Sequence, residues 1–396
     1  MGSVIGANIR RLRDERGWSQ ARLGRETCRI AGLSADSIGR KEISRYELGR
    51  RTPREWLPFI AQALGVTIAD LKVPCAAVEL AKRDRPPGLS VARGDEFAHG
   101  IRRMSARLVA LDNEMHGLPI AEMAARSFKT VHRRLGDGSC VTAKCERDVQ
   151  SAAAELAEIA GWALFNEGKF TASRRFNQEA LFLAQLSRDR SVELITLQNM
   201  GMLAGWTGRS REELAIARSV IERHALTPRV EAMFRAREAQ GLAASGQPSE
   251  AARSFDRARS LLQDSGPDDE PYWAWWVTER EIDRQQGRAL HVTGRWREAI
   301  PVLVRAMEFW SEAHVGYGNV ASVRLLDCLL EASSWREAEE EAGKLLPVLA
   351  EMSSVVTLNL LEKVASRGRE LTKAPSGLRD VLHRISIGMD EDPYEI

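Results

Sequence analysis

The sequence predicts an all-α protein made of two domains. Apolar residues recur at helical spacing along the chain, and no segment shows the alternating pattern that is typical of a half-buried strand. With 396 residues the chain is also too long for one ordinary core, so it should divide into smaller units. A short turn motif recurs through its C-terminal two thirds, which indicates repeated helical hairpins. We therefore expect a small helical domain followed by an α-solenoid.

Composition limits where the protein acts and what it can bind. Hydrophobic residues make up 44% of the chain and charged residues 28%, as in folded soluble proteins. No apolar run is long enough to span a membrane, and the first residues lack the apolar core of a signal peptide, so we expect a cytoplasmic protein without a membrane partner. The five cysteines form no CxxC motif, so we expect neither a metal site nor a cofactor.

Charge is divided unevenly along the chain. Residues 1–85 contain 17 Lys and Arg against 10 Asp and Glu, a net of +7, whereas the remaining residues contain 40 against 45. A basic N-terminal part on a mildly acidic body fits phosphate binding by the N-terminal part alone.

The N-terminal domain is predicted over residues 1–81. Helical periodicity indicates helices at 5–16, about 20–30, about 40–48 and within 55–66. Residues that stop or cap a helix mark their ends, namely Gly17, Ser19 and Gly49. The inner faces should form the core, with Ile43, Leu48, Leu57, Ile60 and Leu64. Short helices with a Gly-containing turn between the second and third describe a helix-turn-helix.

Three segments of this domain carry a family resemblance. Together, IRRLRDERGWSQ, EISRYELGRRTP and FIAQALGVTIADL resemble the lambda-repressor-like (Xre) family, which implies a five-helix domain that binds double-stranded DNA. One departure is clear: 22 residues lie between Gln20 and Ile43, roughly nine more than the usual spacing. A longer second helix or a wider turn is therefore expected.

The resemblance also implies which residues contact DNA. The third helix should lie in the major groove with its first turn toward the base edges. The base-reading positions of the family correspond to Arg40, Lys41 and Arg45. Ser44 and Glu42 are candidates for phosphate or cytosine contacts. The expected phosphate-binding residues are Gln20, Arg50 and Arg51. Arg13 and Glu47 match a buried pair that joins the first helix to the third, a structural role.

A linker should join the two domains at residues 82–96. This segment is charged and has little apolar content, and Pro86 and Pro87 forbid a continuous helix across it.

The second domain, residues 97–396, contains the repeated turn motif. Its five copies are EGKFTAS, TGRSREE, SGQPSEA, TGRWREA and ASSWREA, with turn positions at Gly168, Gly208, Gly246, Gly294 and Ser333. These positions are 40, 38, 48 and 39 residues apart. Twelve residues beyond three of the turns stand Ala180, Ala258 and Ala306, where a small side chain lets helices approach closely. A helical hairpin at this period indicates tetratricopeptide-like (TPR-like) repeats, longer than the usual ones.

The resemblance extends over most of the chain. LDNEMHG, ELAEIAGWALFNEGKF, NQEALFLAQLSRD and DEPYWAWW look like actinobacterial Xre regulators with TPR-like bodies. The domain order also resembles the peptide-sensing regulators of Gram-positive bacteria (the RRNPP group). That likeness implies a homodimer whose affinity for DNA is controlled by a ligand.

The ligand candidates lie on the first helix of each hairpin, which lines the concave face of such stacks. They are Asn166, Gln198, Asn199, Arg237, Trp276 and Arg280. Three indoles within residues 273–276 cannot all face one side of a helix, so at least one should reach solvent or a groove.

Three functions remain open at this level. The leading hypothesis is a transcriptional regulator whose body dimerises and senses a peptide or small molecule. The alternative is an interaction scaffold, in which the body docks a protein partner and the helix-turn-helix only localises it. A third hypothesis, an antitoxin-like regulator, suits much shorter chains. No P-loop, GxGxxG after a strand or HExxH motif is present, so we do not expect an enzyme.

Overall fold

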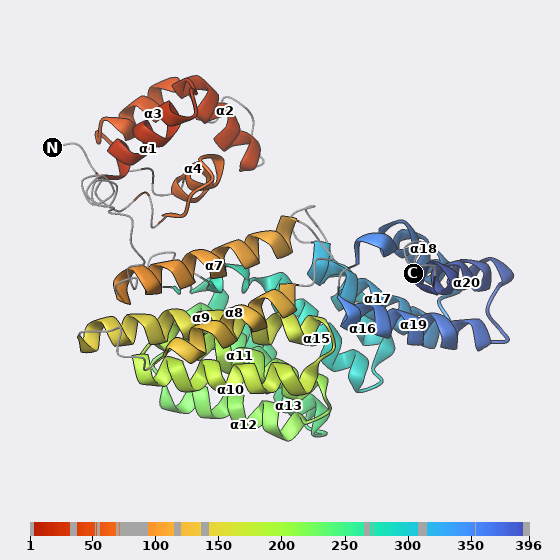
Figure 1. Ribbon diagram of the computed structural model, residues 1–396. Coiled ribbons are helices and arrows are strands. Elements are labelled where there is room, and N and C mark those ends of the chain that lie inside the picture. The colour runs from red at the N-terminus through yellow and green to blue at the C-terminus, as the bar shows by residue number, and fades with distance from the viewer. Residues whose placement is uncertain are drawn as a thin grey trace. The chain divides into compact units, whose positions relative to one another are not determined.

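The computed structural model shows two compact units, residues 1–90 and 91–396, which are described separately below. The structure describes residues 4–31, 38–51, 53, 56–68, 71, 94–114, 120–135, 142–264, 270–271, 273–307, 315–352 and 354–390. These residues form α-helices and short 3₁₀ turns, and none of them lies in a strand, so the all-α prediction is confirmed (Figure 1).

Four helices are described in the N-terminal unit. They are α1 (Val4–Glu15), α2 (Gln20–Ile30), α3 (Arg40–Glu47) and α4 (Leu57–Ala63). Each overlaps a predicted helix, and α2 is bounded as expected because the Ser19 side chain accepts a hydrogen bond from the Arg22 amide at its start. The fifth predicted helix lies outside the described residues. Nine residues separate α2 from α3, so the extra residues of this domain lie between these two helices.

The N-terminal core contains the predicted residues with one exception. Ile43, Leu57, Ile60 and Leu64 are buried. Leu48 is 50% exposed, so the prediction that it belongs to the core was wrong. The reason is local: α3 ends at Glu47, and Gly49 adopts a left-handed conformation (φ +66°) that turns the chain away from the core.

Two glycines allow close helix contacts around α3. A Cβ atom at Gly6 would lie 2.2 Å from the backbone oxygen of Tyr46, and one at Gly24 would lie 2.6 Å from that of Ile38. Both positions therefore require a residue without a side chain.

In the second unit, the described helices follow one another as hairpins. The first six of these are α7 (Gly94–Glu114), α8 (Ile120–Arg134), α9 (Ala143–Asn166), α10 (Phe170–Ser187), α11 (Arg190–Trp206) and α12 (Ser210–Arg223). It continues with α13 (Pro228–Ala244), α14 (Pro248–Gln263), α15 (Glu279–Val292), α16 (Trp296–Met307), α17 (Val315–Glu331), α18 (Trp335–Leu345), α19 (Val355–Glu370) and α20 (Ser376–Asp390). Helix α7 begins within the predicted linker, whose residues 82–93 lie outside the described residues.

All five predicted turn positions lie between the two helices of a hairpin. Their φ angles are positive: +70° at Gly168, +76° at Gly208, +78° at Gly246, +72° at Gly294 and +59° at Ser333. A left-handed residue after a helix lets the chain reverse within a few residues, and glycine adopts it without steric cost. The buried Ala180, Ala258 and Ala306 lie on the second helices of their hairpins, as the repeat predicted. The solenoid of helical hairpins is thus confirmed.

Helices that are far apart in the solenoid also contact each other. Helix α19 contacts α9, and Phe165, Leu203 and Val356 form a small buried cluster between α9, α11 and α19. The Trp206 ring packs edge-on against Phe165, with ring centroids 5.7 Å apart. We call this cluster of Phe165, Leu203, Val356 and Trp206 the seam. The described helices include none with the length and apolar content needed to cross a membrane.

We expect Gly6→Ala to destabilise the N-terminal unit, because its methyl group would overlap the Tyr46 carbonyl and force α1 away from α3. Overpacking of this kind costs about 1–3 kcal/mol. Hydrogen exchange of peptides from α1 and α3 in the full chain measures the loss locally.

Gly39→Ser is the matched control for this substitution. Gly39 is the N-cap of α3, and a Cβ there would meet no described atom within 4 Å. Serine is a good N-cap, so protection should be unchanged or increased. Equal protection in Gly6→Ala and the wild-type chain would contradict the packing described for α1 and α3.

Candidate functional site

Helix α3 presents one face to solvent, with Arg40 and Lys41 in its first turn and Arg45 in its last. Arg40, Lys41 and Arg45 are exposed, while Ile43 and Tyr46 on the opposite face are buried in the core. The three cations predicted to read bases therefore lie on the outer part of one short helix. The N-cap, Gly39, offers no side chain to the first amides of α3.

Glu42 organises two of the neighbouring cations. Arg45 donates to one of its carboxylate oxygens, and Arg51 lies 3.3 Å from the other. All three side chains are partly solvated, so these ion pairs are weak and can exchange for contacts with phosphate or bases. Arg50 is exposed in the loop that follows, and Ser44 is half-buried on α3.

A buried ion pair holds α3 against α1. Arg13 donates from Nε to Glu47 Oε1 at 2.6 Å and from Nη2 to Oε2 at 3.1 Å. Its Nη1 donates to the Trp18 carbonyl at 2.8 Å. The hydrogen bond to Glu47 raises the pKa of Arg13 further. The Arg13–Glu47 pair predicted from the resemblance is therefore present.

Gln20 contacts this pair. Its Nε2 donates to Glu47 Oε2 at 2.6 Å, so its side chain points toward α3 in this structure. The predicted phosphate contact of Gln20 stays a prediction. The observed bond ties the start of α2 to the end of α3.

A cysteine holds the chain where it enters α3. The Ile38 amide donates to Cys28 Sγ at 3.3 Å, and the thiol lies 3.8 Å from the Ile38 carbonyl. Cys28 is buried at the end of α2, and Ile38 precedes the N-cap of α3. The sequence predicts buried thiols without a metal site but gives no signal for this contact, because it joins the two ends of an inserted segment.

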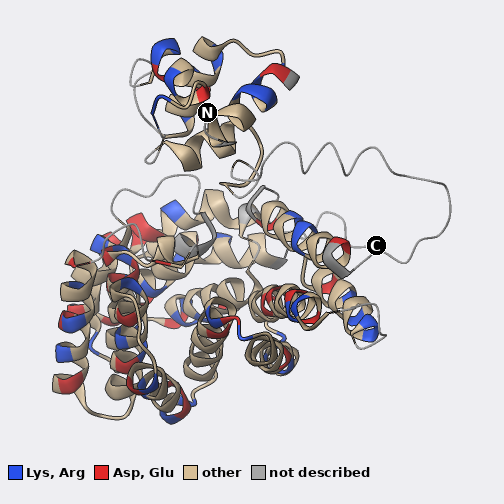
Figure 2. Ribbon diagram, turned by 90° about the vertical axis from the view of Figure 1, so that its left-hand side faces the viewer, with Lys and Arg blue, Asp and Glu red and all other residues tan. Residues whose placement is uncertain are grey.

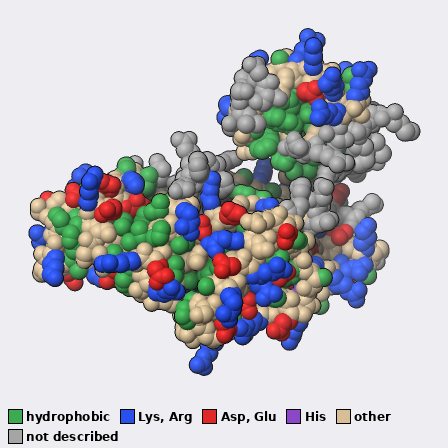
Figure 3. Space-filling view, turned by 180° about the vertical axis from the view of Figure 1, so that it is seen from behind, with side chains coloured by type: hydrophobic (Ala, Val, Ile, Leu, Met, Phe, Trp, Pro, Cys, Tyr) green, Lys and Arg blue, Asp and Glu red, His purple; other side chains and the backbone are tan. Residues whose placement is uncertain are grey.

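The two units differ in surface charge. On the face shown in Figure 3, the N-terminal unit carries mainly Lys and Arg rather than Asp and Glu. Along the body, acidic and basic residues are interspersed on the helices (Figure 2). This agrees with the division of net charge in the sequence.

Comparison with known proteins addresses the N-terminal unit. Residues 4–72 match a protein-family model described as a helix-turn-helix domain. The N-terminal unit contains a helix-turn-helix domain. No curated protein matches the chain. In this helix-turn-helix domain, α2 and α3 are the two helices of the motif, and the nine residues between them form an unusually long connection.

Three of the predicted ligand residues are connected inside the body. Arg237 on α13 donates to Gln198 at 3.0 Å, and Gln198 on α11 donates to Asn199 at 3.3 Å. Asn199 donates to Glu158 on α9 at 2.6 Å. Three successive first helices are therefore joined by one chain of hydrogen bonds.

This chain continues through α13 and α15. Arg237 and Arg288 lie 3.4 and 3.7 Å from Glu213 Oε1, and Gln240 donates to Gln285 at 2.8 Å. Arg284 donates to both oxygens of Glu281, at 2.7 and 2.6 Å. We call the whole set the polar network: Glu158, Gln198, Asn199, Glu213, Arg237, Gln240, Glu281, Arg284, Gln285 and Arg288.

The other three predicted ligand residues lie elsewhere. Asn166 is half-buried at the last turn of α9. Trp276 lies in a 3₁₀ turn (Ala274–Trp276) before α15, so the prediction that it stands on the first helix of a hairpin was wrong; it packs against an apolar cluster that includes Leu194 and Val230. Arg280 is exposed on the first turn of α15. The expectation about the three indoles is confirmed by Trp275, which is 61% exposed.

Burial shifts the pKa values of two residues in this network. It raises the pKa of Glu158 to about 7, although the hydrogen bond from Asn199 opposes the shift. It lowers the pKa of Arg237 to about 10, opposed by the charge of Glu213. Arg237 could be predicted from its place on a first helix, whereas Glu158 and Glu213 could not, because their shielding from solvent depends on packing between hairpins.

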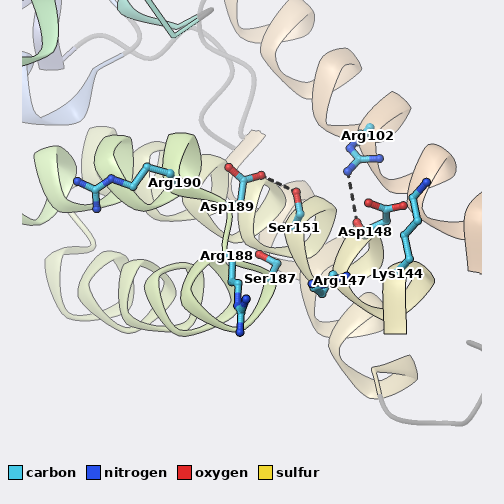
Figure 4. Close-up of a pocket in the computed structure, with 9 residues that line it drawn as sticks. All are labelled: Arg102, Lys144, Arg147, Asp148, Ser151, Ser187, Arg188, Asp189 and Arg190. Atoms are coloured by element: carbon cyan, nitrogen blue, oxygen red, sulfur yellow. Dashed lines mark hydrogen bonds between the residues drawn. The ribbon is translucent and has the colours of Figure 1, made fainter. Parts of the chain in front are cut away.

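A second group of charges lines a surface pocket of about 490 Å³ near the N-terminal end of α9 (Figure 4). Its lining residues are Arg102, Lys144, Arg147, Asp148, Ser151, Ser187, Arg188, Asp189 and Arg190. Ser151 donates to Asp189 at 2.6 Å, and Arg102 donates to the Asp148 carbonyl at 3.4 Å. Arg188 and Arg190 point in different directions from the turn between α10 and α11, so these cations do not converge.

The raised pKa of Glu158 predicts a pH-dependent stability. Folding favours the protonated carboxyl between its ordinary pKa of 4.5 and about 7, so the wild-type chain should lose stability as pH rises through this window. Glu158→Gln has no such proton. Relative to the wild type, it should gain about 2 kcal/mol between pH 5 and pH 8 in urea unfolding.

Glu146→Gln is the control for removal of a carboxylate, because Glu146 is exposed on the first turn of the same helix. Its stability relative to the wild type should not change between pH 5 and pH 8. A wild-type minus Glu158→Gln difference that is flat from pH 5 to pH 8 would show that Glu158 is ionised normally.

Proposed function

We propose that this protein is a transcriptional regulator of the Xre type, in which the helix-turn-helix domain binds an operator and the TPR-like body dimerises and senses a peptide or small molecule. Three observations support it: the family match over residues 4–72, the surplus of basic residues in the N-terminal part, and the buried polar network on the first helices of the body. We assign the chain a cytoplasmic location and no catalytic step.

The exposed face of α3 is the observation that carries the proposal. Arg40, Lys41 and Arg45 are anchored by a helix whose other face is core, so they can enter a major groove together. Arginine forms two hydrogen bonds with guanine O6 and N7, which supplies specificity. Ser44, Gln20, Arg50 and Arg51 are our candidates for phosphate contacts, which supply affinity. A homodimer would read two half-sites about 34 Å apart or a multiple of this distance.

Operator selection from random DNA with the full chain, followed by sequencing, tests this function. We expect one enriched sequence with two-fold symmetry. On that operator, Arg45→Ala should weaken binding by about 10- to 150-fold and relax the choice of one base, because it removes a base contact. Its affinity for random DNA should change much less.

Arg50→Ala is the matched control, since Arg50 is exposed beyond the end of α3. It should weaken binding to all sequences similarly and lower the salt dependence by about one phosphate contact. Equal losses on operator and random DNA for Arg45→Ala would remove Arg45 from base reading. Failure to enrich any sequence would contradict the regulator.

A second candidate function is a scaffold whose body docks another protein. One observation favours a protein contact on the body: Phe182 and Leu186, one turn apart on α10, are 57% and 47% exposed. Adjacent exposed apolar side chains are typical of protein interfaces.

Light scattering of the purified full chain separates the two functions. The regulator hypothesis predicts that the chain is a homodimer in the absence of other proteins. Phe182→Asp then tests whether the exposed face of α10 forms part of the dimer interface. A monomer that instead purifies from its native host with one stoichiometric protein would favour the scaffold.

A further inference from the structure

Arg324 is buried in the body but, among the described residues, has no contact with a carboxylate of the polar network. It lies on α17 and is 3% exposed, with its guanidinium 5.1 Å from the Trp206 ring centroid. Among the described residues it forms no hydrogen bond or ion pair, and its Nη1 atom is fully shielded from solvent without a partner. By comparison, Arg237, Arg284 and Arg288 all reach a carboxylate.

The surroundings of Arg324 are short of negative charge. Glu281 is engaged with Arg284, and Glu213 lies between Arg237 and Arg288. In the described part of the body, these two carboxylates are therefore engaged by Arg237, Arg284 and Arg288, and neither forms an ion pair with Arg324. Burial, then the charges of Arg288 and Arg284, lower the pKa of Arg324. Arginine nevertheless keeps its proton in proteins, and a buried charge without a counter-ion is strongly unfavourable.

We propose that Arg324, together with Arg288 and Arg284, forms a binding site for the oxyanion group, carboxylate or phosphate, of a small ligand. The site deepens the proposed sensing function, on which it rests, by naming the chemistry that the body recognises. A guanidinium presents paired N–H groups that match two oxygens of one anion. Both Arg288 and Arg324 contact the Trp206 ring, with their guanidinium carbons 5.8 and 5.1 Å from its centroid.

The surface pocket near α9 is a weaker candidate for the same chemistry. It contains five cations, but they are accompanied by Asp148 and Asp189 and point in different directions. Nη2 of Arg190 is also shielded from solvent without a partner, but the Arg190 side chain is 37% exposed and pairs with Glu193, whereas Arg324 is 3% exposed and has no ion pair among the described residues. A variant in this pocket therefore provides a control.

Thermal unfolding of the full chain tests the site with two defined probes. Sodium phosphate and sodium succinate are each compared with sodium chloride at equal ionic strength. We expect at least one of them to raise the Tm by about 2–5 °C above chloride, as saturation of a site in the folded state does. Arg324→Met should abolish this rise, and Arg147→Met in the surface pocket should retain it. General salt effects act on all three proteins, so the comparison isolates the site.

Two readouts distinguish binding from a structural role. In chloride alone, Arg324→Met should unfold at the same or a higher temperature than the wild type, because it removes an unpaired buried charge. Arg324→Lys, which keeps the charge but not the paired N–H groups, should show a reduced anion response and serves if the Met variant does not fold.

The response to each probe also identifies the ligand chemistry or contradicts the site. A response to phosphate alone supports a phosphorylated ligand, and a response to succinate alone supports a carboxylate. The site is overturned if neither probe exceeds chloride in the wild type, or if Arg324→Met keeps the response. Operator binding by the same preparations is measured separately. Intact operator binding with no anion response would refute the anion site and leave the regulator standing.

Discussion

One carboxylate sets the geometry of the helix-turn-helix domain. Glu47 accepts hydrogen bonds from Arg13 on α1 and from Gln20 on α2, so the direction of α3 depends on two other helices at once. Arg40 and Lys41 stand at the opposite end of α3, roughly 10 Å away along the axis, whereas Arg45 lies in the same last turn as Glu47. A small rotation at Glu47 would therefore displace Arg40 and Lys41 at the far end. Both side chains of the Arg13–Glu47 pair are buried, so water could not take the place of either one if it were removed. The remaining charge would then be buried without a partner, which is strongly destabilising.

The body uses buried polar contacts in a comparable way. Hydrogen bonds from Glu158 through Asn199 and Gln198 to Arg237 join α9, α11 and α13, and each donor needs a defined acceptor. Such contacts are sensitive to distance and angle, whereas apolar packing tolerates small shifts. They therefore fix how successive hairpins align.

Local signals explain what could be predicted from the sequence. The caps and stop glycines mark helix ends within a few residues, and Gly168, Gly208, Gly246 and Gly294 mark reversals that only a left-handed residue makes easily. The exposure of Leu48 could not be predicted, because one residue of helix length decides it. Glu213 and Arg324 resemble ordinary surface charges in the sequence. Their burial depends on contacts between hairpins that are far apart in the chain, and no periodicity encodes these.

The seam should make the solenoid unfold more cooperatively than an open array of repeats. In an open array each hairpin touches only its neighbours, so hairpins can fray from either end, and copies can be gained or lost with little penalty. Here Phe165 on α9 and Val356 on α19 belong to one cluster, which joins two ends of the array across about 190 residues. Loosening any hairpin between them strains that closure. The body should therefore melt as one unit, and its number of hairpins should be as constrained as the number of strands in a closed barrel.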